Sequence, residues 1–245
     1  MWIFCGGMPR SGSTVQFQLT AHLVEDARRG ARIEWTRPEE FPRVRDGHAA
    51  RHDWKVFKSH TCTDEMLAEF QTHNAMGVYV FRDVRDVMLS RMRKSGASFE
   101  TLWQAGFLDR VLNSFDRWTH LEAVLVSRYE EMVTDMAREV RRIAAHLGLS
   151  ISPEQGERLA SEYTVARQRE RIRQAAATSR LQHIARVTYD PVSNLHLDHI
   201  RSGQIGEWRT ALLREHVAMI EDRARSWLLA NGYGLSASGS ESDHP

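Results

Sequence analysis

The residues best suited to chemistry lie within the first fifteen positions of the chain. Residues 7–14 read GMPRSGST and differ by one residue from the phosphate-binding template G-x-x-x-x-G-K-[ST], because Ser13 stands where the template has lysine. Glycines let backbone N–H groups approach a phosphate, and Ser11, Ser13 and Thr14 add hydroxyl donors. The stretch predicts a phosphate-binding loop whose one cation is Arg10. A tight strand-to-helix turn with capping serines is the alternative.

A second chemical stretch is Lys58-Ser59-His60, at the end of the apolar run 54–58. Side chains two residues apart on an extended segment point to the same side, so Lys58 and His60 can reach one reacting centre. His60 can take up a proton near neutral pH, and Lys58 can stabilise charge on a bridging oxygen. The tripeptide alone would also suit an exposed polar strand end.

A third stretch, FRDVRDVMLS at 81–90, begins where the apolar run 77–81 ends. Arg82 leaves the end of that run, and Ser90 follows eight residues later, about two helical turns on. One face of a helix can therefore present a guanidinium and a hydroxyl to a second phosphate. Capping and ion pairing are the roles we assign to the other charged residues, Asp83, Arg85 and Asp86.

A fourth stretch, HIRSGQIGEWR at 199–209, places Arg201 before two glycines and Glu207-Trp208 after the second one. This pattern predicts a loop that folds back over an anion. A surface turn at the start of the last helix explains the stretch equally well.

The elements that must position these residues alternate between strands and helices. Apolar runs predict strands at 2–5, 31–35, 54–58, 77–81 and 123–126. Helical spacing predicts helices at 14–27, 65–73, 83–94 and 131–147, and the pattern from Pro153 onward is helical, with a final helix over 208–229. Such alternation predicts a parallel sheet, in which ligands gather at the carboxyl ends of the strands.

Composition limits the classes of protein that the chain can belong to. At 245 residues we predict one domain over 1–235 and a disordered polar tail over 236–245. Lys and Arg number 33 against 32 Asp and Glu, a net charge of +1, so the chain lacks the general positive field of a nucleic-acid-binding protein. Its two cysteines form neither a disulfide framework nor a metal-binding pattern, which suits a reducing compartment.

The apolar start of the chain reads as a buried strand and is too short for a signal peptide. No run approaches the roughly 18 apolar residues of a membrane span. We therefore predict a soluble, cytoplasmic protein, and the sequence leaves a homodimer open.

Together the four stretches resemble the sulfotransferases that use 3′-phosphoadenosine 5′-phosphosulfate (PAPS). The family keeps its loop cation in the middle of the loop, where Arg10 stands in place of the usual lysine. The matching segments, in family order, are Pro9–Thr14 for P-K-S-G-T-T, Lys58–His60 for K-[ST]-H, Arg82 with Ser90 for the 3′-phosphate segment, Tyr129–Met132 for Y-E-[DE]-[LM], and Arg201–Trp208 for R-x-G-x-x-G-[DE]-W.

The resemblance implies a three-layer, P-loop-like α/β fold with a central parallel sheet flanked by helices. It also implies in-line transfer of a sulfuryl group from PAPS to a hydroxyl, or in second place an amine, of a small acceptor, without a metal. The catalytic residues would be His60 as general base with Lys58 and Arg10. The nucleotide would be bound by Arg10, Ser11, Gly12, Ser13, Thr14, Arg82, Ser90, Tyr129, Arg201, Ser202 and Gly203.

Two features of the predicted site stay open. The aromatic residue with which the family commonly stacks adenine is Val15 here, so we expect Tyr129 to contact the adenine instead. An apolar or aromatic-lined acceptor pocket and an ordinary protein core both account for the aromatic residues Trp35, Trp54, Trp103, Phe107 and Trp118.

Two other functions fit part of the pattern. A P-loop small-molecule kinase shares the strand, loop and helix, but such enzymes keep lysine where this chain has Ser13. A non-catalytic nucleotide-binding module would have no use for both Lys58 and His60.

Overall fold

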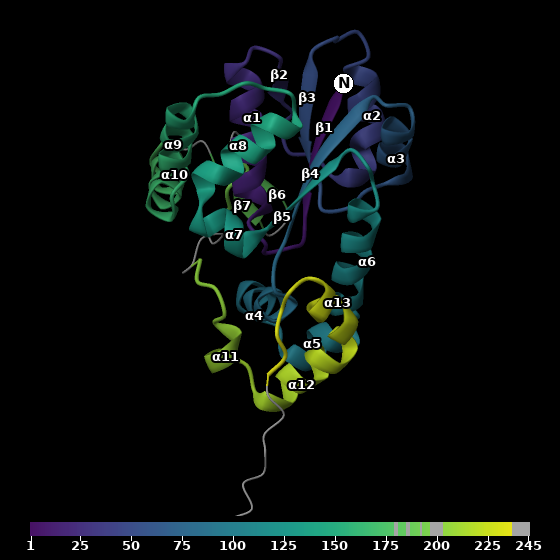
Figure 1. Cartoon of the computed structure of the whole chain (residues 1–245), viewed down its shortest axis with the longest axis vertical. Coiled ribbons are helices and arrows are strands. Elements are labelled where there is room, and N and C mark those ends of the chain that lie inside the picture. Colours follow the sequence, from purple (N-terminus) through teal and green to yellow (C-terminus); the bar gives the residue numbers. More distant parts are fainter. Residues whose placement is uncertain (179–180, 185–186, 192, 197–202, 237–245) are drawn as a thin grey trace, which may run out of the picture. The chain divides into compact units, whose positions relative to one another are not determined.

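The computed structural model describes residues 1–178, 181–184, 187–191, 193–196 and 203–236 (Figure 1). The chain divides into two compact units. Unit 1 comprises Met1–Arg82 and Asn113–Gly203, and unit 2 comprises Asp83–Leu112 and Gln204–Pro245. The single domain over 1–235 therefore stays a prediction. No helix in the described part of the chain has the length and apolar content needed to cross a bilayer.

Unit 1 is built on a five-stranded sheet in which every neighbouring pair is parallel. The strands, in the spatial order β2-β3-β1-β4-β5, are β2 (Gly30–Arg32), β3 (Trp54–Lys58), β1 (Trp2–Gly7), β4 (Ala75–Phe81) and β5 (Val124–Arg128). Every residue of β1 is buried, as expected of a central strand that is covered on both faces. Four of the predicted strands agree closely with these bounds. The fifth, predicted at 31–35, is observed as the shorter strand Gly30–Arg32.

Helices cover both faces of this sheet (Figure 1). One face is aliphatic: Ile3 and Cys5 of β1 belong to a core cluster with residues of α1 (Ser13–Asp26), α8 (Met136–His146) and α9 (Pro153–Glu162). The opposite face is aromatic. Phe4 contacts Phe41 of α2 (Phe41–Gly47) and Phe70 of α3 (Asp64–Gln71), with ring centroids 5.2 and 5.5 Å apart. The predicted three-layer α/β fold is confirmed.

Side chains alternate between the two faces of each strand, which explains how one sequence builds both layers. Ile3 faces the aliphatic layer, whereas Phe4 faces the aromatic layer, where Phe70 also meets Trp118 of α6 (Phe107–Thr119) at 6.2 Å. The polar residues at the strand ends lie beyond this core, at the carboxyl edge of the sheet.

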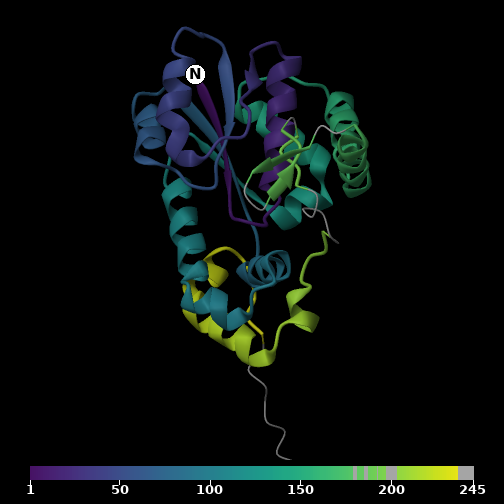
Figure 2. The same ribbon diagram turned by 180° about the vertical axis from the view of Figure 1, so that it is seen from behind.

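The remaining elements of unit 1 correct two predictions. The predicted helix over 131–147 is two helices, α7 (Tyr129–Thr134) and α8, because Asp135 leaves the helical conformation and its side chain accepts the Arg138 N–H to start a new helix. A short 3-10 helix, η1 (Pro38–Glu40), precedes α2. The prediction that the chain is helical from Pro153 onward is wrong after α10 (Val165–Ala177), where strands follow. An antiparallel pair of strands, β6 (Gln182–Ile184) with β7 (Val187–Tyr189), follows α10 and is seen in front of α1 in the view of Figure 2.

Unit 2 is helical and contains α4 (Val84–Ser95), α5 (Phe99–Gln104) and the first turns of α6. The predicted final helix over 208–229 is three helices, α11 (Trp208–Ala211), α12 (Arg214–Arg223) and α13 (Arg225–Ala230). The backbone is extended at Leu212 and Leu213, and it leaves the helical conformation again at Ala224, with φ of −106° and ψ of 15°. Of the predicted tail, Ser236 donates to Glu221 through its N–H and its hydroxyl, so disorder is wrong for that residue, and 237–245 lie outside the described residues.

A buried ion-pair cluster holds unit 2 together. The Arg85 guanidinium, 1% exposed, lies 2.8 Å from Asp83 and 2.5 Å from Glu221 and stacks on the Trp208 ring at 3.8 Å. Asp83 also caps α4, since its side chain accepts the Arg85 N–H. The capping and ion-pairing roles assigned to Asp83 and Arg85 from the sequence are confirmed.

Two glycines of unit 1 give a matched test of the packing of β2 against β3. A Cβ built on Gly30 would lie 1.9 Å from the Trp54 carbonyl oxygen, so Gly30→Ala must push β2 away from β3. We expect its free energy of unfolding to fall by about 1–3 kcal/mol. Gly47 ends α2 with nothing within 4 Å of such a Cβ, and Gly47→Ala should be neutral or stabilise by up to about 1 kcal/mol. Urea unfolding monitored by circular dichroism measures both, and equal effects would contradict this account of the β2–β3 contact.

Candidate active site

The loop between β1 and α1 is pinned to the end of β4. The Met8 N–H donates to the Val80 carbonyl oxygen at 2.9 Å, and the buried Ser11 hydroxyl lies 2.7 Å from the Met8 and 2.9 Å from the Val80 carbonyl oxygens. The backbone takes the left-handed conformation at Arg10 and Gly12, with φ of 69° and 82°. These bonds form the loop within the protein itself, and the contact of Ser11 with the nucleotide stays a prediction.

The start of α1 offers an anion site. No side chain caps this helix at Gly12, and its first turn contains no acidic residue. The first N–H groups and the positive end of the helix dipole are therefore suited to a negative ligand, in keeping with the predicted phosphate-binding loop. Gly12 is required here, because a Cβ at this position would come within 2.9 Å of Tyr129 and Met132 side-chain atoms.

Lys58 and His60 reach this same loop from the end of β3. The parallel register places Lys58 beside Cys5, and the Lys58 Nζ donates to the Thr14 Oγ1 at 3.0 Å. The His60 Nδ1 lies 2.7 Å from the Gly7 carbonyl oxygen. Because a carbonyl can only accept, Nδ1 carries the proton, and the Nε2 of the neutral ring is left as the base.

The electrostatics of this corner favour a neutral histidine beside a readily titrated lysine. Burial, with a further contribution from Arg10, lowers the pKa of Lys58 to about 8, although Cys5 acts in the opposite direction. Part of His60 is open to solvent, but the protein atoms around its ring and the charges of Lys58 and Arg10 lower its pKa to about 4. At neutral pH His60 is therefore unprotonated and able to accept a proton.

The part of α6 that belongs to unit 1 holds the His60 backbone. The Ser114 hydroxyl and the Trp118 indole N–H both donate to the His60 carbonyl oxygen, at 2.9 and 3.3 Å. Trp118 is fully buried against Phe70 and Tyr79. Of the two interpretations open for Trp118, core residue or acceptor contact, the structure supports the core residue.

Arg82 and Tyr129 form the other side of the loop. The Arg82 guanidinium lies 4.4 Å from the centre of the Tyr129 ring, and its Nη1 is 3.4 Å from the Arg10 carbonyl oxygen. The Tyr129 hydroxyl donates to the Gly203 carbonyl oxygen at 3.0 Å. Tyr129 thus joins the loop, Arg82 and Gly203, and its contact with adenine stays a prediction.

Unit 1 brings most of the predicted residues together through five close approaches. The pairs are Lys58 with Thr14, His60 with Gly7, Arg82 with Arg10, Tyr129 with Gly12, and Tyr129 with Gly203. Ser90 is half-buried in α4 of unit 2, and its predicted role is untested. Arg201 and Ser202 lie outside the described residues. Sequence analysis missed the carbonyl partner of His60, since the residue type at Gly7 carries no signal for a main-chain acceptor.

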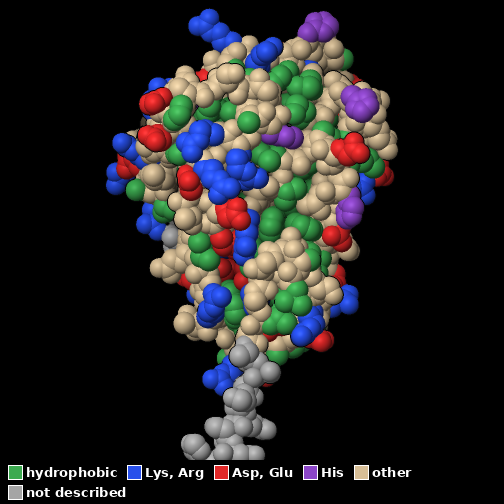
Figure 3. All heavy atoms as spheres, viewed as in Figure 1, with side chains coloured by type: hydrophobic (Ala, Val, Ile, Leu, Met, Phe, Trp, Pro, Cys, Tyr) green, Lys and Arg blue, Asp and Glu red, His purple; other side chains and the backbone are tan. Residues whose placement is uncertain are grey.

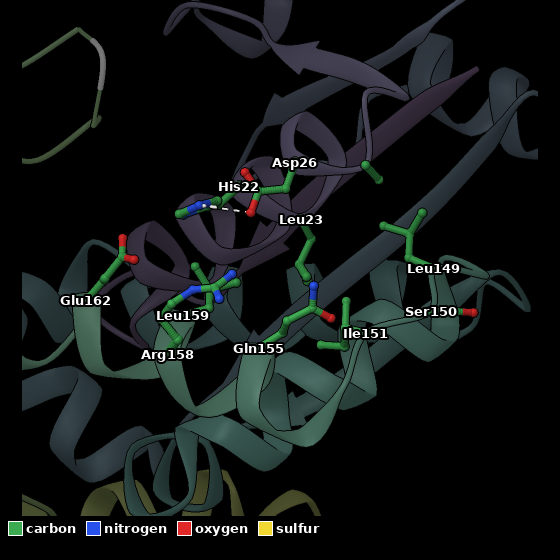
Figure 4. Close-up of a pocket in the computed structure, with 11 residues that line it drawn as sticks. His22, Leu23, Asp26, Leu149, Ser150, Ile151, Gln155, Arg158, Leu159 and Glu162 are labelled. Atoms are coloured by element: carbon green, nitrogen blue, oxygen red, sulfur yellow. Dashed lines mark ion pairs between the residues drawn. The ribbon is translucent and has the colours of Figure 1, made fainter.

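A separate hollow of about 150 Å³ lies in unit 1 between the C-terminal half of α1 and α9 (Figure 4). It is lined by His22, Leu23, Asp26 and Ala27 and by residues between 149 and 162, none of them a predicted site residue. Among the residues that the structure describes, no group of three or more His, Cys, Asp or Glu side chains is arranged to hold a metal ion.

The parallel sheet, the loop at the end of β1 and the basic strand ends define a P-loop-like α/β protein with a site suited to an anionic ligand. Residues 3–232 match the sulfotransferase domain family, and the chain belongs to this family. The prediction of a sulfotransferase, made from the sequence, is confirmed. A sequence comparison with curated proteins gives no match.

Solved structures share the fold. A retinol dehydratase with androsterone and the inactive cofactor PAP has a TM-score of 0.66 at 18% identity, covering 93% of this chain and 80% of that one. The same enzyme with retinol and PAP has a TM-score of 0.62 at 18% identity, covering 93% and 81%. Mouse sulfotransferase SULT7A1 with PAP has a TM-score of 0.69 at 15% identity, covering 92% and 83%.

The two pKa values predict a bell-shaped pH profile. With an aliphatic alcohol as acceptor, which does not ionise in this range, kcat/KM should rise with pH as His60 loses its proton near pH 4 and fall as Lys58 loses its proton near pH 8. Lys58→Arg should remove the alkaline limb, because a guanidinium stays charged. An alkaline limb that persists in this variant would assign it to another group.

Proposed function

We propose that this sulfotransferase moves a sulfuryl group from PAPS to a hydroxyl of a small-molecule acceptor by in-line transfer, with His60 as general base. The observation that carries the proposal is the meeting of Lys58 and His60 at the loop, through the Thr14 hydroxyl and the Gly7 carbonyl at 3.0 and 2.7 Å. A proton acceptor and a cation are thereby fixed beside a loop suited to phosphate.

The donor is bound at two places in this proposal. The N–H groups at the start of α1, with Arg10, Ser13 and Thr14, hold the 5′-phosphosulfate. Arg82 holds the 3′-phosphate together with Ser90 and the segment of Arg201, Ser202 and Gly203. Support for PAPS as donor comes from the family match and from the PAP in the structures of similar fold.

The chemical step breaks one bond and forms another. The acceptor oxygen forms a bond to sulfur while the bond from sulfur to the phosphate oxygen breaks, and PAP leaves. The His60 Nε2 takes the acceptor proton, since Nδ1 is committed to the Gly7 carbonyl. Lys58 and Arg10 stabilise the negative charge that grows on the bridging and leaving oxygens.

The acceptor is a small molecule, with a hydroxyl preferred to an amine. Androsterone and retinol in the retinol dehydratase structures support an apolar acceptor. Trp35, which follows β2, is half-buried, and its ring is tilted against the Tyr189 ring with the centroids 5.6 Å apart. It is our candidate for an acceptor contact. A cytoplasmic location and a homodimer stay predictions.

Adenosine 3′,5′-bisphosphate (PAP) binding tests the donor. PAP should bind at least about tenfold more tightly than adenosine 5′-monophosphate (AMP), because each charge-assisted contact to the 3′-phosphate contributes about 1.5–3 kcal/mol. Isothermal titration calorimetry without magnesium measures both affinities. Equal affinities would refute PAPS as the donor, and a strict need for magnesium would support a kinase.

His60 variants test the base. His60→Ala and His60→Asn should both reduce turnover by about 10²–10⁴-fold, because neither side chain can take the proton. The asparagine variant is the matched control, since its amide N–H can still donate to the Gly7 carbonyl and should keep PAP affinity near that of the wild type. Turnover of His60→Asn near the wild-type rate would move the base to another residue.

A further inference from the structure

Asp86 is a buried carboxylate in the first turn of α4, where it is 1% exposed. Its Oδ2 accepts the Gly206 N–H at 2.7 Å and its Oδ1 accepts the Trp208 N–H at 3.1 Å. Hydrogen bonds from N–H groups to an ionised carboxylate are roughly twice as strong as those between neutral groups. Asp86 therefore holds the backbone of a distant loop by both of its oxygens.

The loop that Asp86 holds is fixed by further contacts. Gly206 takes the left-handed conformation with φ of 76°, which a glycine adopts without steric strain. The Trp208 indole N–H donates to Asp83 at 3.1 Å, and its ring packs on the Arg85 guanidinium. The end of the loop is thus fixed to the first turn of α4 by contacts inside unit 2.

The two tethered segments continue along the chain into predicted ligands of the 3′-phosphate. Arg82 lies four residues before Asp86, and Ser90 lies four residues after it, one helical turn along α4. On the other segment, Gly203 lies three residues before Gly206, after Arg201 and Ser202. The carboxylate sits at the point where these two segments are joined.

We propose that Asp86 is a positioning residue for the 3′-phosphate: it fixes the backbone at Gly206 and Trp208, just after the predicted ligand Gly203, before the nucleotide binds. The inference rests on the proposed function, because it takes PAPS as the donor. Asp86 acts through the backbone of Gly206 and Trp208, since both of its oxygens are directed to these N–H groups.

The sign of one measurement separates this role from simple electrostatics. A negative charge near a phosphate site repels the ligand, so neutralising Asp86 without moving the loop would strengthen PAP binding. If the carboxylate orders the loop, the same change must weaken PAP binding. The free-energy cost of ordering the loop is then part of ligand binding and lowers the affinity.

The test compares Asp86→Asn with two controls by calorimetry. For Asp86→Asn we expect PAP affinity to fall about tenfold, AMP affinity to stay within about twofold, and the donor KM to rise while kcat changes little. Asp222→Asn removes a charge from an exposed position of α12, and Ile220→Val destabilises the buried core of the same unit. Both should keep the wild-type ratio of PAP to AMP affinity.

The outcomes distinguish the two proposals. A wild-type protein that binds PAP and AMP equally would refute the proposed function, whereas discrimination unchanged or increased in Asp86→Asn would overturn the role of Asp86 alone. Because Asp86→Asn can fail to fold, hydrogen–deuterium exchange on the wild type provides a second measurement. The Gly206 and Trp208 amides should be protected without ligand, and rapid exchange of both would also overturn the proposal.

Discussion

The pairing of β1 with both of its neighbours is the constraint on which the site depends. Its register with β3 places Lys58 beside Cys5, and its register with β4 places Val80 beside Gly7, where the Met8 and Ser11 bonds close the loop. Arg82 follows β4 directly, and His60 follows β3. Lys58, Arg82 and His60 are therefore brought to the loop by the backbone hydrogen bonds of the sheet, which place the ends of their strands at one edge.

Patterns that are local in sequence predicted most of this fold, and contacts between distant residues decided the rest. The strands at 54–58 and 77–81 are continuous apolar runs, and the motifs around Arg10 and Lys58 are contiguous, so both could be found without a structure. The break at Asp135 depends on a capping bond that competes with helix continuation. The partners of Asp86 lie 120 and 122 residues away, which no local pattern can indicate.

The charge of the site is local in an otherwise balanced protein. Basic and acidic side chains are interspersed on the face in Figure 3, in keeping with a net charge of +1. At the loop, by contrast, Arg10 lowers the pKa of both Lys58 and His60. A multiply charged nucleotide would relieve this mutual repulsion, so donor binding should raise both pKa values and stabilise the folded state by linkage.

The anchor of His60, the proposed base, is made of main chain, and this limits how the enzyme can evolve. A histidine oriented by a carboxylate loses its partner through one substitution, whereas the Gly7 carbonyl is present whatever the side chain at that position. Residues larger than glycine are disfavoured at position 7, because a Cβ there would lie 2.8 Å from Ser13 and 2.9 Å from Val80. The orientation of His60 is thus robust to point mutation, and selection can adjust its basicity through the residues that bury its ring and through the neighbouring charges.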